Sequence, residues 1–565
     1  MRNVWARFGL LALGLGLVLL NLLLQRFFVR WDLTQDRRFS ITDVTRATLD
    51  SLQAPVTATL YMEGDFPPTL QRLQVATLTL LEEYAARSRA SFTVVRQNPA
   101  DDPEARAAFD SLGLYPGETV VTKSEVEEQR IVCYPFVRLS YQGRSQYIDL
   151  LKGSNNAQSD IEALATAEAQ LEYKLTSGLR RLALTRPVTV GLYAVPGALT
   201  PNQMPELLAE LVRLYQPAAI DLRRGPVLVP PGYPEAIPGA IVLDALVLPQ
   251  PTRPFSEREK YTLDQYLMRG GSLLWLLDQV AVSEADLNET GSTLAQARQL
   301  NLDDFFFKSG LKLSYTAALD VKCGYIDALA RVQGRDRIQP QRWVYFPLVQ
   351  QFEPHPVTRG LDAVLLRFAS TLDTLPSPGI EKTVLFRTSP YSVAKRAPFV
   401  IDFNETLRYR PDPTELRGGG QLPLAVALSG TFSSLFVGRQ PPTDSLAPTP
   451  PAGSFRATSA GRGRQVVIAD GAVVEGNHSR VVGDGPGLVL DNKLLVLNAL
   501  DYLVGDEALT QIRNREVRFR TLDRTKVLGS ETTLRVVNLT VPLLLVVVAG
   551  VVIAWRRRRR YGTRR

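Results

Sequence analysis

The sequence predicts an α/β protein in which two α/β domains in tandem are held between two transmembrane helices. Three observations carry this prediction. Apolar stretches of membrane-spanning length lie near both ends, at residues 8–28 and 536–555. Between them, apolar strands alternate with amphipathic helices, as in parallel sheets covered on both faces. The 565 residues include only two cysteines, so the folded part must depend on hydrophobic cores rather than on disulfides.

The two apolar stretches are each long enough to cross a hydrocarbon core of about 30 Å. The first holds one charged residue, Arg26, and the second holds none. We expect an uncleaved anchor at the N-terminus, because this run is longer than the apolar part of a secretory signal and no A-x-A-like site follows it. Gly14, Gly16 and Gly550 are candidate packing points against other transmembrane helices, since small residues allow close approach.

Arginines set the expected orientation of the two spans. Five of them follow the second span without a break: Arg556, Arg557, Arg558, Arg559 and Arg560. The positive-inside rule places the basic tail, residues 556–565, in the cytoplasm. Two spans then place residues 1–7 in the cytoplasm as well and export everything between the spans.

The charge distribution argues against a nucleic-acid partner. The formal net charge is +8, but the last ten residues contribute +7 and the first seven contribute +2, which leaves −1 for residues 8–555. A basic tail beside a span serves as an orientation signal and contacts lipid headgroups. We therefore expect the lipid bilayer, and no nucleic acid, as a partner.

The first α/β domain is expected over residues 39–158. Its elements are, in order, a helix capped by Thr42, a strand (residues 56–62), a helix (70–87), a strand (91–97), a helix (103–112) and strands near ETVVTK, QRIVCYPFVRLSY and QYIDLL. The first strand, helix and strand form a βαβ unit, and the whole has the element order of a thioredoxin-like domain. No CxxC motif is present, so a redox activity is not expected.

A bridging helix is expected over residues 159–184, where apolar residues recur every three or four positions and Ser159 with Glu162 matches a capping box. The second domain is expected over residues 185–505 as a flavodoxin-like parallel sheet. Its flexible loops are residues 414–421 and 438–453. A juxtamembrane segment, residues 506–535, leads to the second span.

Local signals place the elements of the second domain. They are a strand in PVTVGLYAV, a helix from the cap Thr200 and Pro201 to Leu214, a strand in AAIDL, a buried strand in AIVLDALVLPQP, a helix with Ser256 as N-cap and Gly270 as C-cap, strands in SLLWLLD, KTVLFRTS and RQVVIADG, and a helix from Asn492 to Leu503. Leu263, Tyr266 and Leu267 are expected to face the sheet.

Recognisable catalytic motifs are absent from the sequence. G-x-x-x-x-G-K-[ST], G-x-S-x-G and H-E-x-x-H do not occur, so we expect no ATP hydrolysis, no catalytic residue, no cofactor and no metal. Cys133 and Cys323 either pair in an oxidising compartment or remain buried free thiols. His355, between two prolines, is expected to cap the turn that follows it.

One weak candidate for a ligand crevice follows the strand RQVVIA. Asp470, Glu475 and His478 come after this strand, and open α/β sheets place ligands at the carboxyl ends of their strands. The alternative is a solvated loop. Asp244 and Asp278, at strand positions, are ambiguous in the same way.

Several long segments resemble the gliding-motility-associated ABC-transporter auxiliary family (GldG). They are RWDLTQDRRFSITDVTRATLDSL, AQLEYKLTSGLRRL, PFSEREKYTLDQYLMRGGSLLWLLD, RWVYFPLV, HPVTRGLD, FASTLDTLPSPGIEKTVLFRTSPYS and LDNKLLVLNALDYLVGDEALTQIRNREVRFRTLDRTK. Together they span nearly the whole chain, in the family's order.

The resemblance implies a bacterial inner-membrane subunit that works with a separate permease and a separate ATPase. It also implies an amidotransferase-like α/β fold for the exported region, but neither cysteine stands at the strand-to-helix elbow that amidotransferase chemistry needs. We therefore expect a non-enzymatic auxiliary, substrate-binding-like subunit of an ABC-type transporter, associated with gliding motility or cell-envelope transport. The alternatives are a structural scaffold without a small ligand and a cell-surface glycan or peptide hydrolase.

Overall fold

The computed structural model describes residues 41–505 together with residues 540, 547–548 and 550–556. Within the first range the description omits residues 65, 100–101, 112–116, 125–126, 152–159, 185, 196, 333–334, 404–405, 407–419, 443–454, 460–462 and 476–489. The contacts divide the chain into two units, residues 1–515 and 516–565, and each is described by itself.

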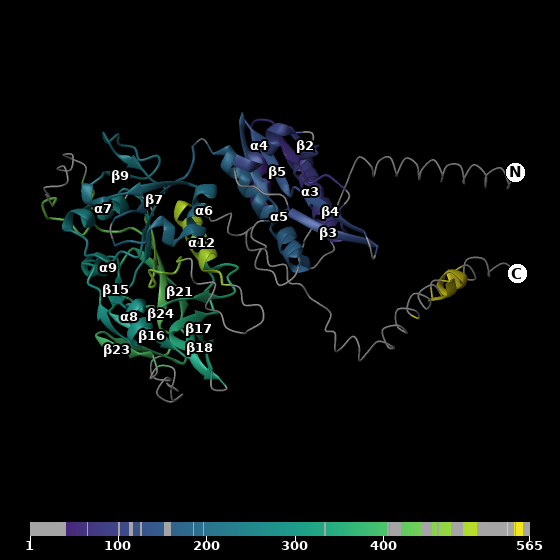
Figure 1. Ribbon diagram of the computed structural model, residues 1–565. Coiled ribbons are helices and arrows are strands. Elements are labelled where there is room, and N and C mark those ends of the chain that lie inside the picture. The colour runs from purple at the N-terminus through teal and green to yellow at the C-terminus, as the bar shows by residue number, and fades with distance from the viewer. Residues whose placement is uncertain are drawn as a thin grey trace, which may run out of the picture. The chain divides into compact units, whose positions relative to one another are not determined.

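The first domain is built on a four-stranded sheet in the order β2-β1-β5-β6. Figure 1 labels β2 and β5 of this sheet. β1 (Val56–Leu60) pairs in parallel with β2 (Phe92–Arg96), and α3 (Pro68–Arg87) connects them, which confirms the predicted βαβ unit. α4 (Pro103–Ser111) and the hairpin of β3 (Gly117–Ser124) and β4 (Glu127–Cys133) follow. β5 (Phe136–Tyr141) and β6 (Arg144–Asp149) then complete the sheet in antiparallel pairing.

The helix predicted as a bridge, α5 (Asp160–Ala183), packs its apolar stripe into the core of this domain. Leu171, Leu175 and Leu179 are buried there with side chains of β1 and β5. The side chain of Thr42 caps α2 (Asp43–Ser51), as predicted, and its backbone N–H donates to the carboxylate of Glu172 at 2.6 Å. Ser159 of the predicted capping box lies outside the described residues.

The second domain is built on a seven-stranded sheet in the order β21-β24-β25-β12-β11-β7-β8. Its strands are β7 (Thr189–Tyr193), β8 (Gln216–Ile220), β11 (Ala245–Pro249), β12 (Ser272–Leu276), β21 (Ile380–Arg387), β24 (Pro423–Gly430) and β25 (Gly463–Ile468). The predicted parallel sheet is confirmed for β8, β7, β11, β12 and β25, whereas β24 and β21 add antiparallel edge pairing. When the five parallel strands are numbered along the chain, their spatial order is 2-1-3-4-5, as in one doubly wound class. The direction in which successive strands are added to the sheet reverses between β7 and β11.

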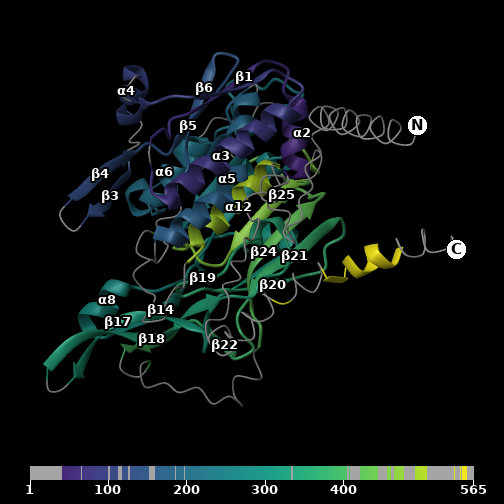
Figure 2. The same ribbon diagram turned by 90° about the vertical axis from the view of Figure 1, so that its right-hand side faces the viewer.

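Helices cover both faces of this sheet. Alternate residues of β11 enter two separate cores, because successive side chains of a strand point to opposite faces. One core includes α6 (Pro205–Leu214) and α12 (Asn492–Val504), which lies beside β25 (Figure 2). The other core includes α7 (Glu257–Met268) through Leu263, Tyr266 and Leu267, as predicted.

Most predicted helix ends are correct, with two exceptions. Ser256 is the N-cap of α7 as predicted, and Glu259 completes a capping box, but the C-cap is Arg269 and the predicted Gly270 lies one residue further on, with φ +94°. The continuous helix predicted from Thr200 is wrong: Thr200 and Gln203 cap only a 3₁₀ turn, η2 (Pro201–Gln203). The backbone of Met204 is not helical, and α6 begins at Pro205.

A large insertion between β12 and β25 forms antiparallel sheets that sequence reasoning did not anticipate. It contains β13 (Val280–Ala281), α8 (Glu284–Thr290), β14 (Ser292–Ala297), α9 (Asp303–Lys308), β15 (Leu311–Ser314), β16 (Thr316–Asp320), β17 (Cys323–Val332), β18 (Arg335–Val349), η4 (Pro356–Thr358), β19 (Val364–Leu365), β20 (Thr371–Thr374), β22 (Ser392–Arg396) and β23 (Phe399–Asp402). Trp343 and Tyr345 anchor its own small core.

Within the described part of the chain, no helix has both the length and the apolarity needed to cross a membrane. The first predicted span, Gly14 and Gly16 lie outside the described residues, and so does most of the second span. Residues 550–556 are helical and exposed, and open space surrounds Gly550. Most of both predicted flexible loops, the basic run after Arg556 and the segment 506–535 also lie outside the description.

Candidate functional site

The carboxyl ends of five parallel strands meet at one edge of the second domain's sheet. Each strand delivers a polar side chain at or just after its last residue: Tyr193 from β7, Asp221 from β8, Gln250 from β11, Asp278 from β12 and Asp470 from β25. In open α/β sheets ligands bind outside this edge, at the point where the strand order reverses. The edge is therefore the candidate site, and its two halves differ.

Asp470, the first predicted crevice residue, is fully buried after β25. One carboxylate oxygen accepts from the backbone N–H of Arg367 and the other from that of Ala472, both at 2.8 Å. Burial and the neighbouring charge of Asp278 raise the pKa of Asp470 well above its usual value. Asp470 is therefore closed to solvent and is bonded to the chain's own backbone.

Arg367 joins Asp470 to Glu475, the second predicted crevice residue. Its guanidinium donates to Glu475 at 3.1 Å and pairs with Glu284 of α8, while its backbone donates to Asp470. The guanidinium carbon lies 5.6 Å from the ring centre of Phe346, a cation–π distance. The structure thus brings Asp470 and Glu475 together around an arginine, and His478 lies outside the described residues.

The two ambiguous strand carboxylates separate to different places. Asp278 is at the carboxyl edge, where it accepts from Gly471 N–H at 2.6 Å and from the Gln250 amide at 2.8 Å. Asp244 precedes β11 at the opposite edge and forms a two-pronged ion pair with Arg186. Only Asp278 can contribute to the candidate site.

Residues 362–370, which we call the strap, are bonded along their length to the β12–β25 half of the domain. The N–H groups of Asp362 and Ala363 donate to Asp491, and Leu365 exchanges two hydrogen bonds with the side chain of Asn492. At its end, Ser370 donates its N–H to the carbonyl oxygen of Ala469 at 2.8 Å. Its hydroxyl accepts from Gln279 N–H at 3.0 Å. The strap therefore occupies this half with the chain's own groups.

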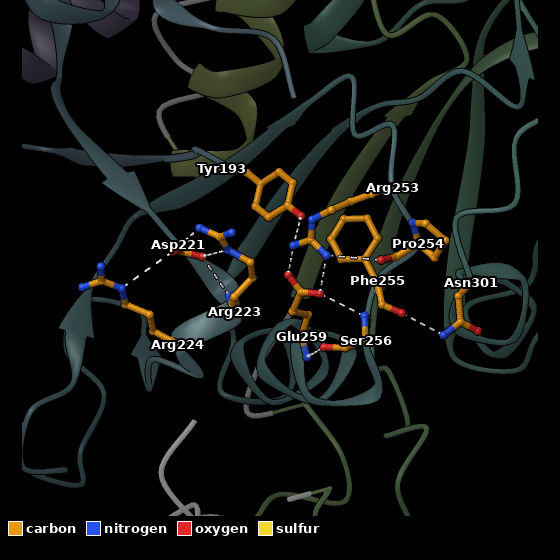
Figure 3. Close-up of polar contacts among 10 residues, drawn as sticks. All are labelled: Tyr193, Asp221, Arg223, Arg224, Arg253, Pro254, Phe255, Ser256, Glu259 and Asn301. Carbon is orange, nitrogen blue, oxygen red and sulfur yellow. Dashed lines mark hydrogen bonds and ion pairs between the residues drawn. The ribbon is translucent and has the colours of Figure 1, made fainter. Parts of the chain in front are cut away.

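The other half centres on Tyr193, where the strand order reverses (Figure 3). Arg253, which follows β11, makes a bidentate pair with the buried Glu259 and donates to the Tyr193 hydroxyl oxygen at 3.0 Å. The ring of Phe255 stacks on Tyr193 at 5.4 Å. Burial raises the pKa of Tyr193, so the phenol is neutral.

Asp221, Arg223 and Arg224 follow β8 in the same view (Figure 3). Asp221 accepts from Arg223 Nε at 2.9 Å and Nη2 at 2.8 Å, and Arg224 lies 3.7 Å away. The hydrogen bonds from Arg223 hold the pKa of Asp221 below its usual value. We call Tyr193, Asp221, Arg223, Arg224, Arg253 and Glu259 the switch-point cluster.

Local sequence explains how this cluster is held in place. Ser256 caps α7, and Glu259, three residues on, accepts from Ser256 N–H at 2.9 Å while it holds Arg253. Asn301, with φ +58°, donates its amide to the carbonyl oxygen of Phe255 at 2.8 Å. Sequence reasoning missed the cluster, although arginines that follow two strand ends would have indicated it once the strand order was known.

Three candidate nucleophiles or bases lie among the described residues: Cys133 and Cys323, which are buried, and His355, which is half-buried. Cys133 and Cys323 are free, buried thiols, and burial raises the pKa of Cys133 to about 12 and that of Cys323 as well. His355 caps the turn Pro356–Thr358 as predicted, since its Nδ1 accepts from Val357 N–H at 3.2 Å. Burial lowers the pKa of His355 to about 4. Among the described residues, no three metal-binding side chains form a group.

Comparison with known proteins identifies the larger part of the chain. Residues 187–499 match the family model of an ABC-type uncharacterized transport system, and residues 35–138 match a domain of unknown function. No curated protein matches the sequence. A solved structure titled "mmIFT52 N-terminal domain" aligns with 56% of this chain and 97% of its own, at 10% identity and a TM-score of 0.29. Because the transport-system model covers more than half of the 565 residues, the chain belongs to the ABC transporter auxiliary family.

Proposed function

We propose that the chain is a non-enzymatic, membrane-anchored auxiliary subunit of an ABC-type transporter. The family match over residues 187–499 is the observation that carries this proposal. The sequence encodes no phosphate-binding loop, and two single spans cannot enclose a solute pathway. A separate ATPase and a separate permease must therefore supply energy and pathway.

The proposed placement is the bacterial inner membrane, with both termini in the cytoplasm and the α/β domains in the periplasm. The sequences of residues 8–28 and 536–555 support it. The described residues of the second stretch are helical and expose Val551, Ile553 and Trp555, side chains that a lipid environment would cover. Membership of the GldG branch, a role in gliding motility or envelope transport, and the thioredoxin-like and flavodoxin-like folds belong to the same proposal.

Absence of catalysis is supported by the chemistry of the candidate nucleophiles. The raised pKa values of Cys133 and Cys323 disfavour a thiolate, and His355 uses its ring nitrogen to cap a turn. Asp470 is fully buried, and Arg367 bonds both Asp470 and Glu475. The second candidate, a scaffold without a small ligand, is favoured by one observation, the strap that occupies the predicted crevice.

Co-purification tests the partnership. The full chain, tagged at its C-terminus and solubilised in a mild detergent, should bring down an ATPase and a permease in constant ratio. A strain with the tag on an unrelated two-span protein is the control. Recovery of the chain alone, with both partners present in the same membranes, would refute the proposal.

Cysteine labelling tests the proposed topology, and the structure indicates that the native cysteines will interfere little. Both native cysteines are buried, so they give a low background with a membrane-impermeant maleimide. Leu294→Cys, at a position 49% exposed in the second domain, should react in intact spheroplasts. Gly562→Cys, in the basic tail, should react only after lysis. The opposite pattern would invert the topology.

A further inference from the structure

We propose that the switch-point cluster binds an anionic group, a carboxylate or a phosphate, through Arg223 and Arg224, with Asp221 as an internal competitor for the same site. This inference goes beyond the proposed function, because it concerns a ligand class and does not require the transporter partners. It depends on the position, the charge and the exposure of the cluster.

The position of the switch-point cluster in the sheet favours ligand binding at this half of the edge. The cluster lies where the strand order reverses between β7 and β11, the place where doubly wound sheets bind ligands. The other half of the edge is occupied by the strap, whose Arg367 and Ser370 are bonded to Asp470 and Ala469. A ligand at the carboxyl edge therefore has the β7–β8–β11 half available to it.

One part of the cluster is fixed. Glu259 is 1% exposed and holds both terminal nitrogens of Arg253, which in turn donates to Tyr193. Because the Tyr193 oxygen accepts from Arg253, the phenol can still donate its own proton. This part forms a rigid support that need not rearrange when a ligand arrives.

The other part can exchange partners. The side chains of Arg223 and Arg224 are 44% and 85% exposed, and their counter-ion Asp221 is only two or three residues away in sequence. Exposed ion pairs of this kind contribute little to stability. A ligand carboxylate or phosphate can therefore replace Asp221 at small cost and take the bidentate geometry that arginine offers.

The net charge of the switch-point cluster indicates that its ligand is negatively charged. The three arginines of the switch-point cluster exceed its two carboxylates by one positive charge. Around the strap the balance is reversed, because Arg298 and Arg367 face three carboxylates, Asp278, Glu284 and Glu475, even when the buried Asp470, whose pKa is raised, is not counted. Among the residues that the structure describes at this edge, the surplus positive charge that attracts an anion therefore lies in the switch-point half.

Direct binding measurements test the inference. The full chain in detergent is dialysed against labelled inorganic phosphate in one arm and labelled acetate in the other, with sodium chloride holding the ionic strength constant. At least one anion should bind saturably at one site per chain. The arm that saturates identifies the class of ligand.

Three variants locate the site. The double change Arg223→Ala with Arg224→Ala should weaken binding at least about tenfold, since it removes both exposed guanidinium groups. Asp221→Asn should tighten binding several-fold, because it removes the competing charge but keeps a side-chain oxygen that can accept from Arg223 N–H, the bond by which Asp221 caps the 3₁₀ turn Leu222–Arg224. Arg46→Ala is the matched control: Arg46 is exposed and pairs with Asp43 three residues away, but lies in the first domain. It should bind like the wild type.

The expected pattern has clear contrary outcomes. No saturable binding of either anion overturns the inference, as does equal binding by the wild type and the double variant. Weaker binding by Asp221→Asn would show that Asp221 builds the site rather than competes for it, and would also overturn the inference. Arg223→Lys with Arg224→Lys keeps the charge and the fold, and should bind with intermediate strength. Failure of co-purification would leave all these results intact.

Discussion

The two halves of one sheet edge use charged side chains in opposite ways. In the β12–β25 half, Asp470 is fully buried and accepts hydrogen bonds from backbone N–H groups that hold the strap. In the β7–β8–β11 half, Asp221 stands at the equivalent place after a strand but pairs with exposed arginines. A carboxylate at the end of a parallel strand can thus serve either the fold or the surface, and burial decides which.

The largest expected effect is a difference in unfolding free energy between variants of these two carboxylates. Asp470→Ala leaves the N–H groups of Arg367 and Ala472 without an acceptor in a buried place and should cost about 4 kcal/mol of unfolding free energy. Asp221→Asn, the matched control, removes the ion pairs but keeps an oxygen that can accept from Arg223 N–H, and should cost less than about 1 kcal/mol. Urea unfolding of the full chain followed by the fluorescence of buried Trp275 and Trp343 measures both. Equal costs would break the comparison.

The next largest effect is the pH dependence of stability that arises from Asp491, which binds the strap. Burial raises the pKa of Asp491, which accepts from Asp362 and Ala363, to about 6. A carboxyl whose pKa is higher in the folded state stabilises the fold below its unfolded pKa, and this contribution is lost as pH rises through the folded value. Wild type should therefore lose about 3 kcal/mol relative to Asp491→Asn between about pH 4 and pH 6. Parallel pH profiles of the two proteins would contradict this.

A smaller effect is expected at Arg367. Its side chain is 10% exposed and pairs with Glu284 and Glu475, so Arg367→Met should cost about 2 kcal/mol through the loss of these two ion pairs and of the cation–π contact. Hydrogen exchange should speed up at the N–H groups of the strap, with the amides of β1 in the first domain as an internal reference. Unchanged exchange in the strap would mean that the backbone bonds alone hold it.

Sequence reasoning succeeded where the determining contacts are local. The Ser256 cap, the Thr42 cap and the turn capped by His355 each join residues no more than three apart, and all three are present. The buried strands could also be predicted from the sequence, because a strand covered on both faces is a nearly continuous apolar run, as β11 is and as β12 is after Ser272. The helix predicted from Thr200 was wrong because a capping residue followed by proline can begin a single 3₁₀ turn as readily as a helix.

What sequence reasoning missed depends on contacts across long separations. The strap donates hydrogen bonds to Asp470 and Asp491, which lie more than 100 residues further along the chain. No local sequence signal near Arg367 predicts these hydrogen bonds. The antiparallel insertion has the same origin, because its strands pair with partners that only the folded chain brings close. Of the predicted crevice, Asp470 and Glu475 are brought together but around an arginine of the insertion, whose arrival the sequence did not indicate.

The smallest effect is expected in the switch-point cluster. Arg224 is 85% exposed and lies 3.7 Å from Asp221, a distance and an exposure at which solvent screens most of the attraction. Arg224→Ala should therefore leave the unfolding midpoint unchanged within error, even though Arg367→Met lowers it. Each change removes one arginine from the same sheet edge, so the pair isolates burial as the variable. If the two variants unfolded at the same urea concentration, exposure would not be what distinguishes the halves, and the arginines after β8 would have to be counted as part of the fold.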